Sequence, residues 1–309
     1  MSRWGRRLGF VLVGLAAALT AASFSYNAVS KPRTEPATAL YPGPFVRLDG
    51  GLHAYRRWGT HGTPIVLVSG FVEPSFAWER VAPILARTHR VYALDLPPFG
   101  YSERRGPYDL ASWADQVQAF ARTLRLRRPL LVGHSLGASV VAEVARRDPT
   151  SVRGIVLLDG DGLRGGGGPT WLRTVLVDPF FTSALRIVVD SDWTIRRILR
   201  SAYGATHPRL GRAEVARWVR PFRVDGTEAG LRKLAHAEVA GLTLDELRTV
   251  RVPARVVFGS EDAAVSPSSG RRVAAVLHAP FVRIPAAGHL ALLTAPAAVA
   301  HAIAASSRP

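Results

Sequence analysis

The chain has 309 residues, and 48% of them are hydrophobic, which is enough for one large α/β core with an insertion. It contains no cysteine, which excludes disulfides, thiolate nucleophiles and cysteine-based zinc sites. The formal net charge is +17, but the arginines that carry it are scattered among predicted helices and form no recognised nucleic-acid-binding motif. We therefore expect solvated basic faces and no nucleic-acid partner.

The N-terminus carries a targeting or anchoring signal. Arg3, Arg6 and Arg7 precede an uncharged apolar stretch over residues 8–24. Its length lies between the roughly 7–15 residues of a signal-peptide core and the roughly 20 of a spanning helix. Residues 1–24 are therefore predicted to be a signal peptide or a membrane anchor. Either one predicts an extracytoplasmic domain, secreted or membrane-anchored, because the arginines stay inside.

Residues 25–44 contain several prolines and predict an extended linker. Beyond it, short apolar runs that predict buried strands alternate with helical patterns. This alternation predicts an α/β core over residues 45–161 and 249–309. The runs occupy residues 65–68, 130–132, 155–158, 256–259 and 281–284.

Residues 162–248 interrupt the alternation and predict a helical cap. A glycine-rich run at 165–168, which could act as a hinge, opens the segment, and helical spacing follows it. A cap over the core would supply the walls of a substrate pocket. Its large apolar side chains include Trp171, Phe181 and Trp218, which we predict to contact substrate.

Residues 133–137, Gly-His-Ser-Leu-Gly, have the Gly-x-Ser-x-Gly pattern between a strand-like run and a helix-like run. A sharp turn between strand and helix exposes the serine hydroxyl, and the flanking glycines avoid clashes in so tight a bend. The pattern therefore nominates Ser135 as a nucleophile. His134 lies beside it and is expected to have a structural role.

A serine nucleophile needs a base, and the base needs an orienting group. His289 lies on a loop after the last predicted strand, in the position for the base. Asp262 follows the preceding strand and fits the acid, with Glu261 as the neighbouring alternative. Asp159, at the end of an earlier strand, is a second alternative. The chain order Ser, acid, His is the order given for α/β-hydrolases.

Over residues 45–301 the chain resembles the α/β-hydrolase family. The resemblance implies a mostly parallel eight-stranded sheet flanked by helices, with an inserted helical cap. Phe71 lies in a loop similar to the family's oxyanion loop, so its backbone N–H and that of Leu136 are implied as oxyanion donors. Ser69 stands where the family usually has histidine. Residues 95–102 are similar to the family's segment after the fourth strand.

The resemblance implies a serine hydrolase that cleaves carboxylic esters, including lipid esters, through an acyl-enzyme intermediate. Ser135 argues against the epoxide hydrolases and haloalkane dehalogenases of this fold, which use aspartate. Carbon–carbon bond hydrolases, perhydrolases and aminopeptidases of the fold use serine and remain alternatives. An alternative of another class is a noncatalytic, membrane-tethered binding protein, which has no need of all three catalytic groups.

No cofactor or metal is expected. The remaining histidines show no metal-ligand spacing, and the sequence has no His-Glu-x-x-His, P-loop or dinucleotide-binding motif. The predicted partners are a small-molecule ester or lipid substrate and, through the N-terminal segment, a membrane.

Overall fold

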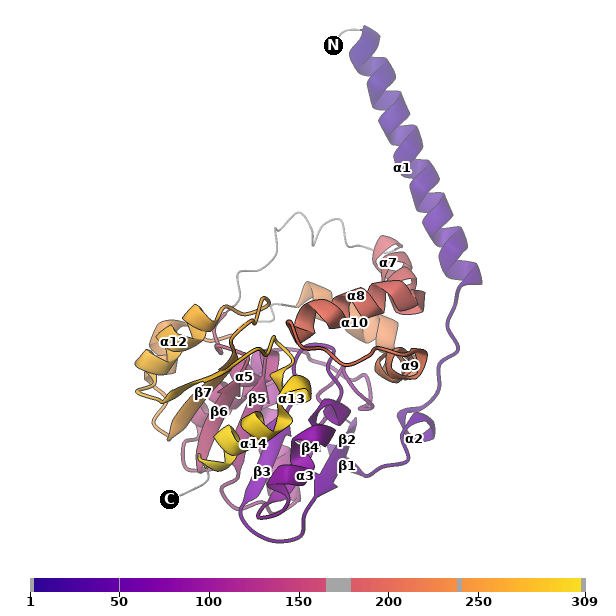
Figure 1. The fold of residues 1–309 in the computed structure, drawn as a ribbon. Coiled ribbons are helices and arrows are strands. Elements are labelled where there is room, and N and C mark those ends of the chain that lie inside the picture. The colour runs from indigo at the N-terminus through magenta and orange to yellow at the C-terminus, as the bar shows by residue number, and fades with distance from the viewer. Residues whose placement is uncertain (1–2, 50, 165–178, 238–240, 307–309) are drawn as a thin grey trace.

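The structure of the protein, a computed structural model, describes residues 3–49, 51–164, 179–237 and 241–306 (Figure 1). Its centre is an eight-stranded sheet in the order β1-β2-β4-β3-β5-β6-β7-β8. The pairs β1–β2 and β2–β4 are antiparallel, and the other neighbours are parallel, which confirms the predicted fold class. The strands are β1 (Phe45–Leu48), β2 (Gly51–Trp58), β3 (Pro64–Val68), β4 (Arg90–Leu94), β5 (Leu130–His134), β6 (Gly154–Leu158), β7 (Ala254–Gly259) and β8 (Phe281–Ile284).

Helices cover both faces of the sheet, so its central strands are apolar on both sides. In β3, Val66 and Val68 pack into one buried cluster, and Ile65 and Leu67 into the other, because successive side chains of a strand point to opposite faces. The first cluster lies under α4 (Leu110–Thr123), α5 (Leu136–Arg147) and α12 (Pro267–Val276). The second lies under η1 (Ser75–Arg80), α3 (Ala82–Leu85), α13 (Ala291–Thr294) and α14 (Pro296–Ala304).

A group of helices between β6 and β7 lies over the carboxyl ends of the parallel strands (Figure 1). We call α7 to α10 the cap helices: α7 (Phe180–Asp190), α8 (Asp192–Tyr203), α9 (Arg212–Val219) with η2 (Arg220–Arg223), and α10 (Thr227–His236). α10 ends at His236, because Ala237 is already extended. α11 (Leu244–Arg248), at the end of the predicted cap segment, buries Leu247 in the first cluster and contacts α5 and α12.

The first helix, α1 (Arg3–Val29), projects from the domain beyond the cap helices (Figure 1). Its apolar side chains are largely exposed, and residues Gly9–Val29 are long and apolar enough to cross a membrane. The helix runs five residues further than the predicted segment 1–24. Residues 25–29 contain neither proline nor glycine, and α1 ends shortly before Pro32, which disfavours helix at the residue before it.

The prediction of an extended linker over residues 25–44 is also wrong for the second half of this segment. Its later part is packed, with a short helix, α2 (Ala37–Leu40), and buried side chains at Leu40 and Tyr41. Glu35 also exchanges backbone hydrogen bonds with the cap, donating to Arg223 at 2.9 Å and accepting from Asp225 at 2.9 Å. The segment therefore connects α1 to the core along a defined path.

Candidate active site

Ser135 occupies a strained turn between β5 and α5. Its φ of 52° and ψ of −118° place it in a region that L-residues rarely adopt, and its N–H donates to the Leu158 carbonyl at 3.0 Å. The neighbouring positions must be glycine, because other backbone atoms lie too close to leave room for a side chain. A Cβ at Gly133 would lie 2.0 Å from the Gly137 carbonyl oxygen, and one at Gly137 would lie 2.3 Å from the Val68 carbonyl oxygen. The turn therefore exposes the Ser135 hydroxyl at the carboxyl edge of the sheet.

Ser135, His289 and Asp262 form a continuous hydrogen-bonded chain. The Ser135 hydroxyl lies 2.9 Å from His289 Nε2, and His289 Nδ1 lies 2.9 Å from Asp262 Oδ2. The other carboxylate oxygen of Asp262 accepts from the N–H groups of Ala264 at 2.8 Å and Val265 at 3.0 Å. These backbone donors fix the carboxylate so that it faces the imidazole.

The two alternative acids face elsewhere. The Glu261 carboxylate accepts from the Ala205 N–H at 2.7 Å, in the connection after α8. Asp159 is fully buried and accepts from the Gly259 N–H at 2.6 Å. Among the described carboxylates, Asp262 is thus the one that hydrogen-bonds to the His289 ring.

Both predicted oxyanion donors belong to segments that lie against Ser135. Leu136 begins α5, so its N–H has no acceptor within the helix. Phe71 follows Gly70, and the backbone of Gly70 packs closely against the nucleophile. A Cβ at Gly70 would lie 2.9 Å from Ser135 Cβ. Ser69, which stands in the place of histidine, accepts from the Trp78 indole N–H at 3.1 Å and so supports the loop.

Sequence reasoning missed a buried ion pair beneath this loop. His134 Nδ1 lies 2.6 Å from Glu73 Oε2, which also accepts from the Gly70 N–H at 2.6 Å. His134 Nε2 donates to the His289 carbonyl at 2.7 Å. His134 therefore connects the loop after β3 with the loop that carries His289. The signal in the sequence was weak: a carboxylate three residues after Gly70 and a histidine beside the nucleophile.

Burial and charge shift two pKa values in this cluster. Burial alone would lower the pKa of His134, but the charge and hydrogen bond of Glu73 dominate together and raise it to about 9. Burial raises the pKa of Asp159 to about 8, against the opposing effects of His134 and the Gly259 N–H. At neutral pH, a charged His134 therefore pairs with Glu73 while Asp159 stays protonated.

We expect the free energy of unfolding to fall as the pH rises from about 6.5 to 9. The folded-state pKa values of both groups lie above their ordinary values, so the folded state holds more protons than the unfolded state: Asp159 contributes up to about pH 8 and His134 up to about pH 9. The loss should be of the order of a few kcal/mol. Urea unfolding at stepped pH measures it, and Asp159→Asn should flatten part of the dependence. Stability that is constant or rises over this window would contradict the assignment.

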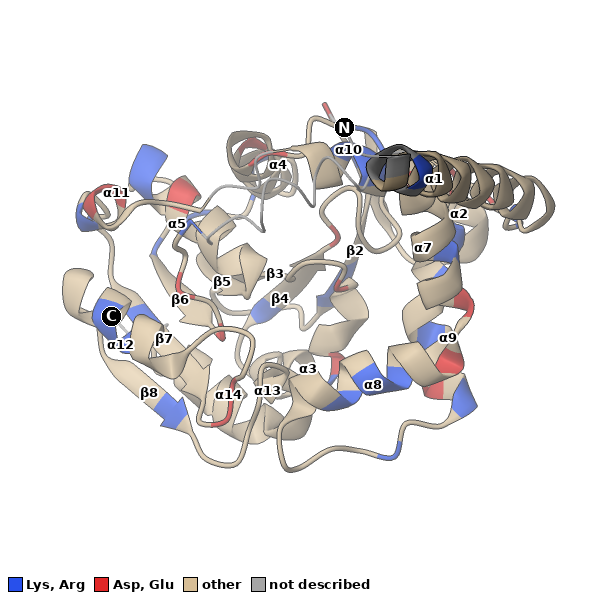
Figure 2. Cartoon of the chain, turned by 90° about the horizontal axis from the view of Figure 1, so that it is seen from above, with Lys and Arg blue, Asp and Glu red and all other residues tan. Residues whose placement is uncertain are grey.

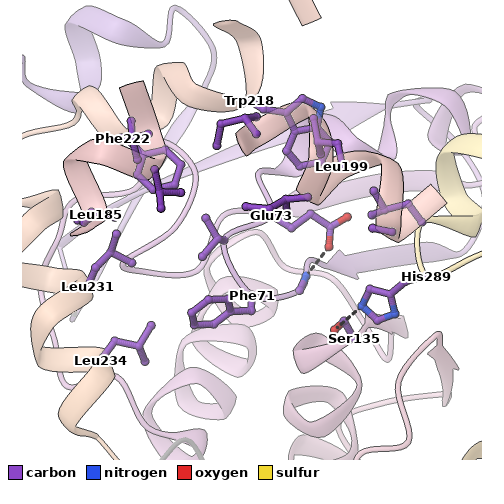
Figure 3. A pocket seen from close by; sticks show the side chains of 18 of the residues that line it. Phe71, Glu73, Ser135, Leu185, Leu199, Trp218, Phe222, Leu231, Leu234 and His289 are labelled. Carbon is purple, nitrogen blue, oxygen red and sulfur yellow. Dashed lines mark hydrogen bonds between the residues drawn. The ribbon is translucent and has the colours of Figure 1, made fainter. Parts of the chain in front are cut away.

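An apolar pocket of about 510 Å³ extends from Ser135 under the cap helices. Figure 3 shows Ser135 and His289 at one end and Leu185, Leu231 and Leu234 at the other. Of the predicted contacts, Phe181 and Trp218 line this pocket, whereas Trp171 lies outside the described residues. The predicted glycine hinge at 165–168 also lies outside them.

The pocket contains few groups that could bind a charged ligand. Its described lining includes no lysine or arginine, and its polar side chains, Glu73, His134, Ser135 and His289, are already engaged with one another or with the backbone. Within the described part of the chain, no group of three or more histidine or acidic side chains could hold a metal ion. The arrangement suits a ligand with an extended apolar part.

The fold and site define a hydrolase of the α/β type. The model of the "Alpha/beta hydrolase family" matches residues 65–302, so the chain belongs to this family. It is similar to the pimeloyl-[acyl-carrier protein] methyl ester esterase of Methylococcus capsulatus, with 31% identity over 69% of this chain and 82% of that protein.

Two solved structures share the fold. An enol-lactonase from Burkholderia xenovorans LB400 has a TM-score of 0.72 at 22% identity and covers 85% of this chain and 99% of its own. A membrane phospholipase A described as a bacterial virulence factor has a TM-score of 0.69 at 23% identity. The alignment with the phospholipase covers 99% of this chain and 98% of the other, and it therefore includes nearly all of α1.

Proposed function

We propose that the protein is a membrane-anchored serine esterase that hydrolyses carboxylic esters with apolar acyl chains. The observation that carries this proposal is the hydrogen-bonded set Ser135–His289–Asp262 at the end of the apolar pocket. A nucleophile within 2.9 Å of a base, which is itself oriented by a carboxylate, is the arrangement that activates serine hydroxyls. A binding protein has no need of it.

In the proposed reaction, Ser135 Oγ attacks the ester carbonyl carbon while His289 Nε2 takes the hydroxyl proton. Asp262 stabilises the imidazolium, and the N–H groups of Phe71 and Leu136 donate to the oxyanion. Collapse of the tetrahedral intermediate expels the alcohol, which takes the proton from His289. Water, deprotonated by His289, then attacks the acyl-enzyme and releases the acid and Ser135.

The pocket lining favours ester substrates over the other serine chemistries of the fold. The described lining offers no cationic side chain for an acid group on the substrate. Glu73 is its only carboxylate and is neutralised by His134, so it is a poor site for a substrate ammonium group. An aliphatic acyl chain, in contrast, is stabilised by about 0.8 kcal/mol for each methylene buried. The similar methyl ester esterase supports the same reaction class.

The helix α1 is proposed to remain as the anchor. Ser23 and Asn27 hydrogen-bond with Ser183 and the Pro179 carbonyl of the cap, at 2.5 and 2.9 Å. Cleavage after residue 24, the end of the predicted segment, would remove Ser23 and separate Asn27 from the rest of α1. The arginines before the apolar stretch would lie inside, leaving the catalytic domain extracytoplasmic.

A panel of p-nitrophenyl esters graded by chain length tests the proposal. We expect kcat/KM to rise by up to about fourfold per added methylene until the pocket is filled. Leu185→Trp, which fills the far end of the pocket, should lower kcat/KM for long chains by roughly 10-fold or more and leave acetate and butyrate nearly unchanged. Leu185→Met, of similar volume, is the control. No turnover of any ester would refute the proposed activity.

A further inference from the structure

The carboxyl end of α1 is fastened to α7 by a polar cluster. Besides the contacts of Ser23 and Asn27, the Arg186 guanidinium donates to the Asn27 carbonyl at 2.5 Å and to the Ser30 hydroxyl at 3.2 Å. Arg186 is only 7% exposed and forms a two-pronged pair with Glu228 of α10, at 2.6 and 2.8 Å. These contacts hold the cap helices against the base of α1.

The length of α1 fixes where this junction lies. Residues Gly9–Val29 form an apolar span of 21 residues, which rises about 31 Å, close to the roughly 30 Å of a bilayer core. Residues 23–29 belong to the end that contacts α7, and residues 9–22 alone rise only about 21 Å. If α1 crosses the bilayer, α7 must therefore lie at the membrane boundary.

The outer face of α7 and α8 has the composition of a membrane-surface contact. Ile187 and Trp193 are large apolar side chains that are 56% and 69% exposed. Arg197 and Arg200 are exposed on the same helix as Trp193, and the Arg197 guanidinium lies 5.7 Å from the centre of the Trp193 ring. Apolar side chains among arginines suit the boundary between acyl chains and anionic headgroups.

This face lies on the side of the domain from which α1 projects. In Figure 1 the cap helices lie between the sheet and the free length of α1, and Figure 2 shows basic residues along α8 from above. Ile198 lies on the other side of α8, with Ile195, Leu199 and Ala202, and lines the pocket although it is 52% exposed. The pocket lining near Ser135 therefore reaches the surface at α8, beside this face.

We propose that Ile187, Trp193, Arg197 and Arg200 form a docking face that rests on an anionic lipid bilayer. Docking places the apolar pocket beside the acyl chains of the membrane. The substrate class is then an acyl ester of a membrane lipid, whose chain passes beside Ile198 toward Ser135. The inference of substrate rests on the proposed esterase activity, and the docking geometry rests on the proposed anchor.

The absence of cysteine allows a direct test with single-cysteine variants of the full chain. Ile187→Cys and Trp193→Cys, which do not line the pocket, would each carry an environment-sensitive NBD probe. Leu15→Cys on α1 reports insertion, and Thr60→Cys, exposed before the amino end of β3, is the control far from the cap. Each variant is reconstituted in vesicles of equal parts phosphatidylcholine and phosphatidylglycerol.

We expect blue-shifted emission and quenching by nitroxide-labelled lipids at positions 15, 187 and 193, and neither effect at position 60. Arg197→Glu combined with Arg200→Glu should reduce quenching at 187 and 193 but not at 15. Quenching at 15 alone would overturn the docking face while leaving the anchor intact. If the probes at 187 and 193 were shielded from water without lipid, and the cysteines formed disulfides between copies, the face would be a dimer interface. That result would also overturn the proposal.

The same samples separate this inference from the proposed activity. Hydrolysis of a soluble ester in detergent by the Ile187→Cys and Trp193→Cys proteins reports the catalytic site alone. If the ester is not hydrolysed, the esterase proposal fails, whatever the probes report. If the ester is hydrolysed and the cap probes stay in water, only the membrane inference fails.

Discussion

Replacing Ser135 with alanine is expected to lower kcat/KM for ester hydrolysis by at least about 10⁴-fold. The change removes the atom that forms the acyl bond, while His289, Asp262 and the oxyanion loop remain in place. The residual rate would come from substrate binding and oxyanion stabilisation alone. Steady-state hydrolysis of p-nitrophenyl butyrate by the full chain in detergent measures the loss.

Ser139→Ala is the matched control for this variant. Ser139 is buried on the same helix, 5% exposed, one turn beyond the nucleophile. It should keep near-parental activity, because the hydrogen bonds of the His289 ring in the described part of the chain go to Ser135 and Asp262. Unfolding by urea should show that both proteins remain folded. Turnover by Ser135→Ala within tenfold of the parent would mean that another group carries the reaction.

Asp262→Asn is expected to lower kcat/KM by about 10⁴-fold, as the loss of the orienting carboxylate does in serine proteases. An amide at this position can donate to Nδ1 of His289, which leaves the proton on Nε2. His289 could then no longer accept the Ser135 proton. The measurement is the same ester assay, run alongside unfolding to show that the fold persists.

Two companion variants decide between the possible acids. Glu261→Gln changes a carboxylate that faces Ala205, and Asp159→Asn changes one that faces Gly259. Both should retain activity within roughly tenfold of the parent, since neither touches the His289 ring. If Asp159→Asn lowered activity as much as Asp262→Asn, the assignment of the orienting role to Asp262 would be wrong.

Local patterns predict the central part of this molecule well. The buried strands have apolar runs bounded by turn residues, and the Gly-x-Ser-x-Gly turn requires a strand before it and a helix after it. Ser135 and His289 follow from these patterns because each lies at the carboxyl end of a strand. Asp262 was favoured over Glu261 and Asp159 on loop position alone, and only side-chain geometry separates the three.

Features that depend on tertiary packing could not be predicted in the same way. Which cap aromatic faces the pocket depends on helix rotation: Trp218 lines it, whereas Trp193 is exposed on the outside. The Glu73–His134 pair joins the loop after β3 to the end of β5, 61 residues apart in sequence, and no local pattern marks it. The end of α1 at Val29 reflects polar contacts with α7 as well as the composition of its own sequence.

The proposed esterase activity requires that Ser135 is an activated nucleophile. The most direct measurement is reaction of the full chain with a compact alkyl fluorophosphonate, followed by mass spectrometry of the peptides. We predict a single adduct on Ser135 that is absent from Ser135→Ala and forms much more slowly in Asp262→Asn. A folded protein that forms no adduct, or one modified at a different residue, would contradict the claim.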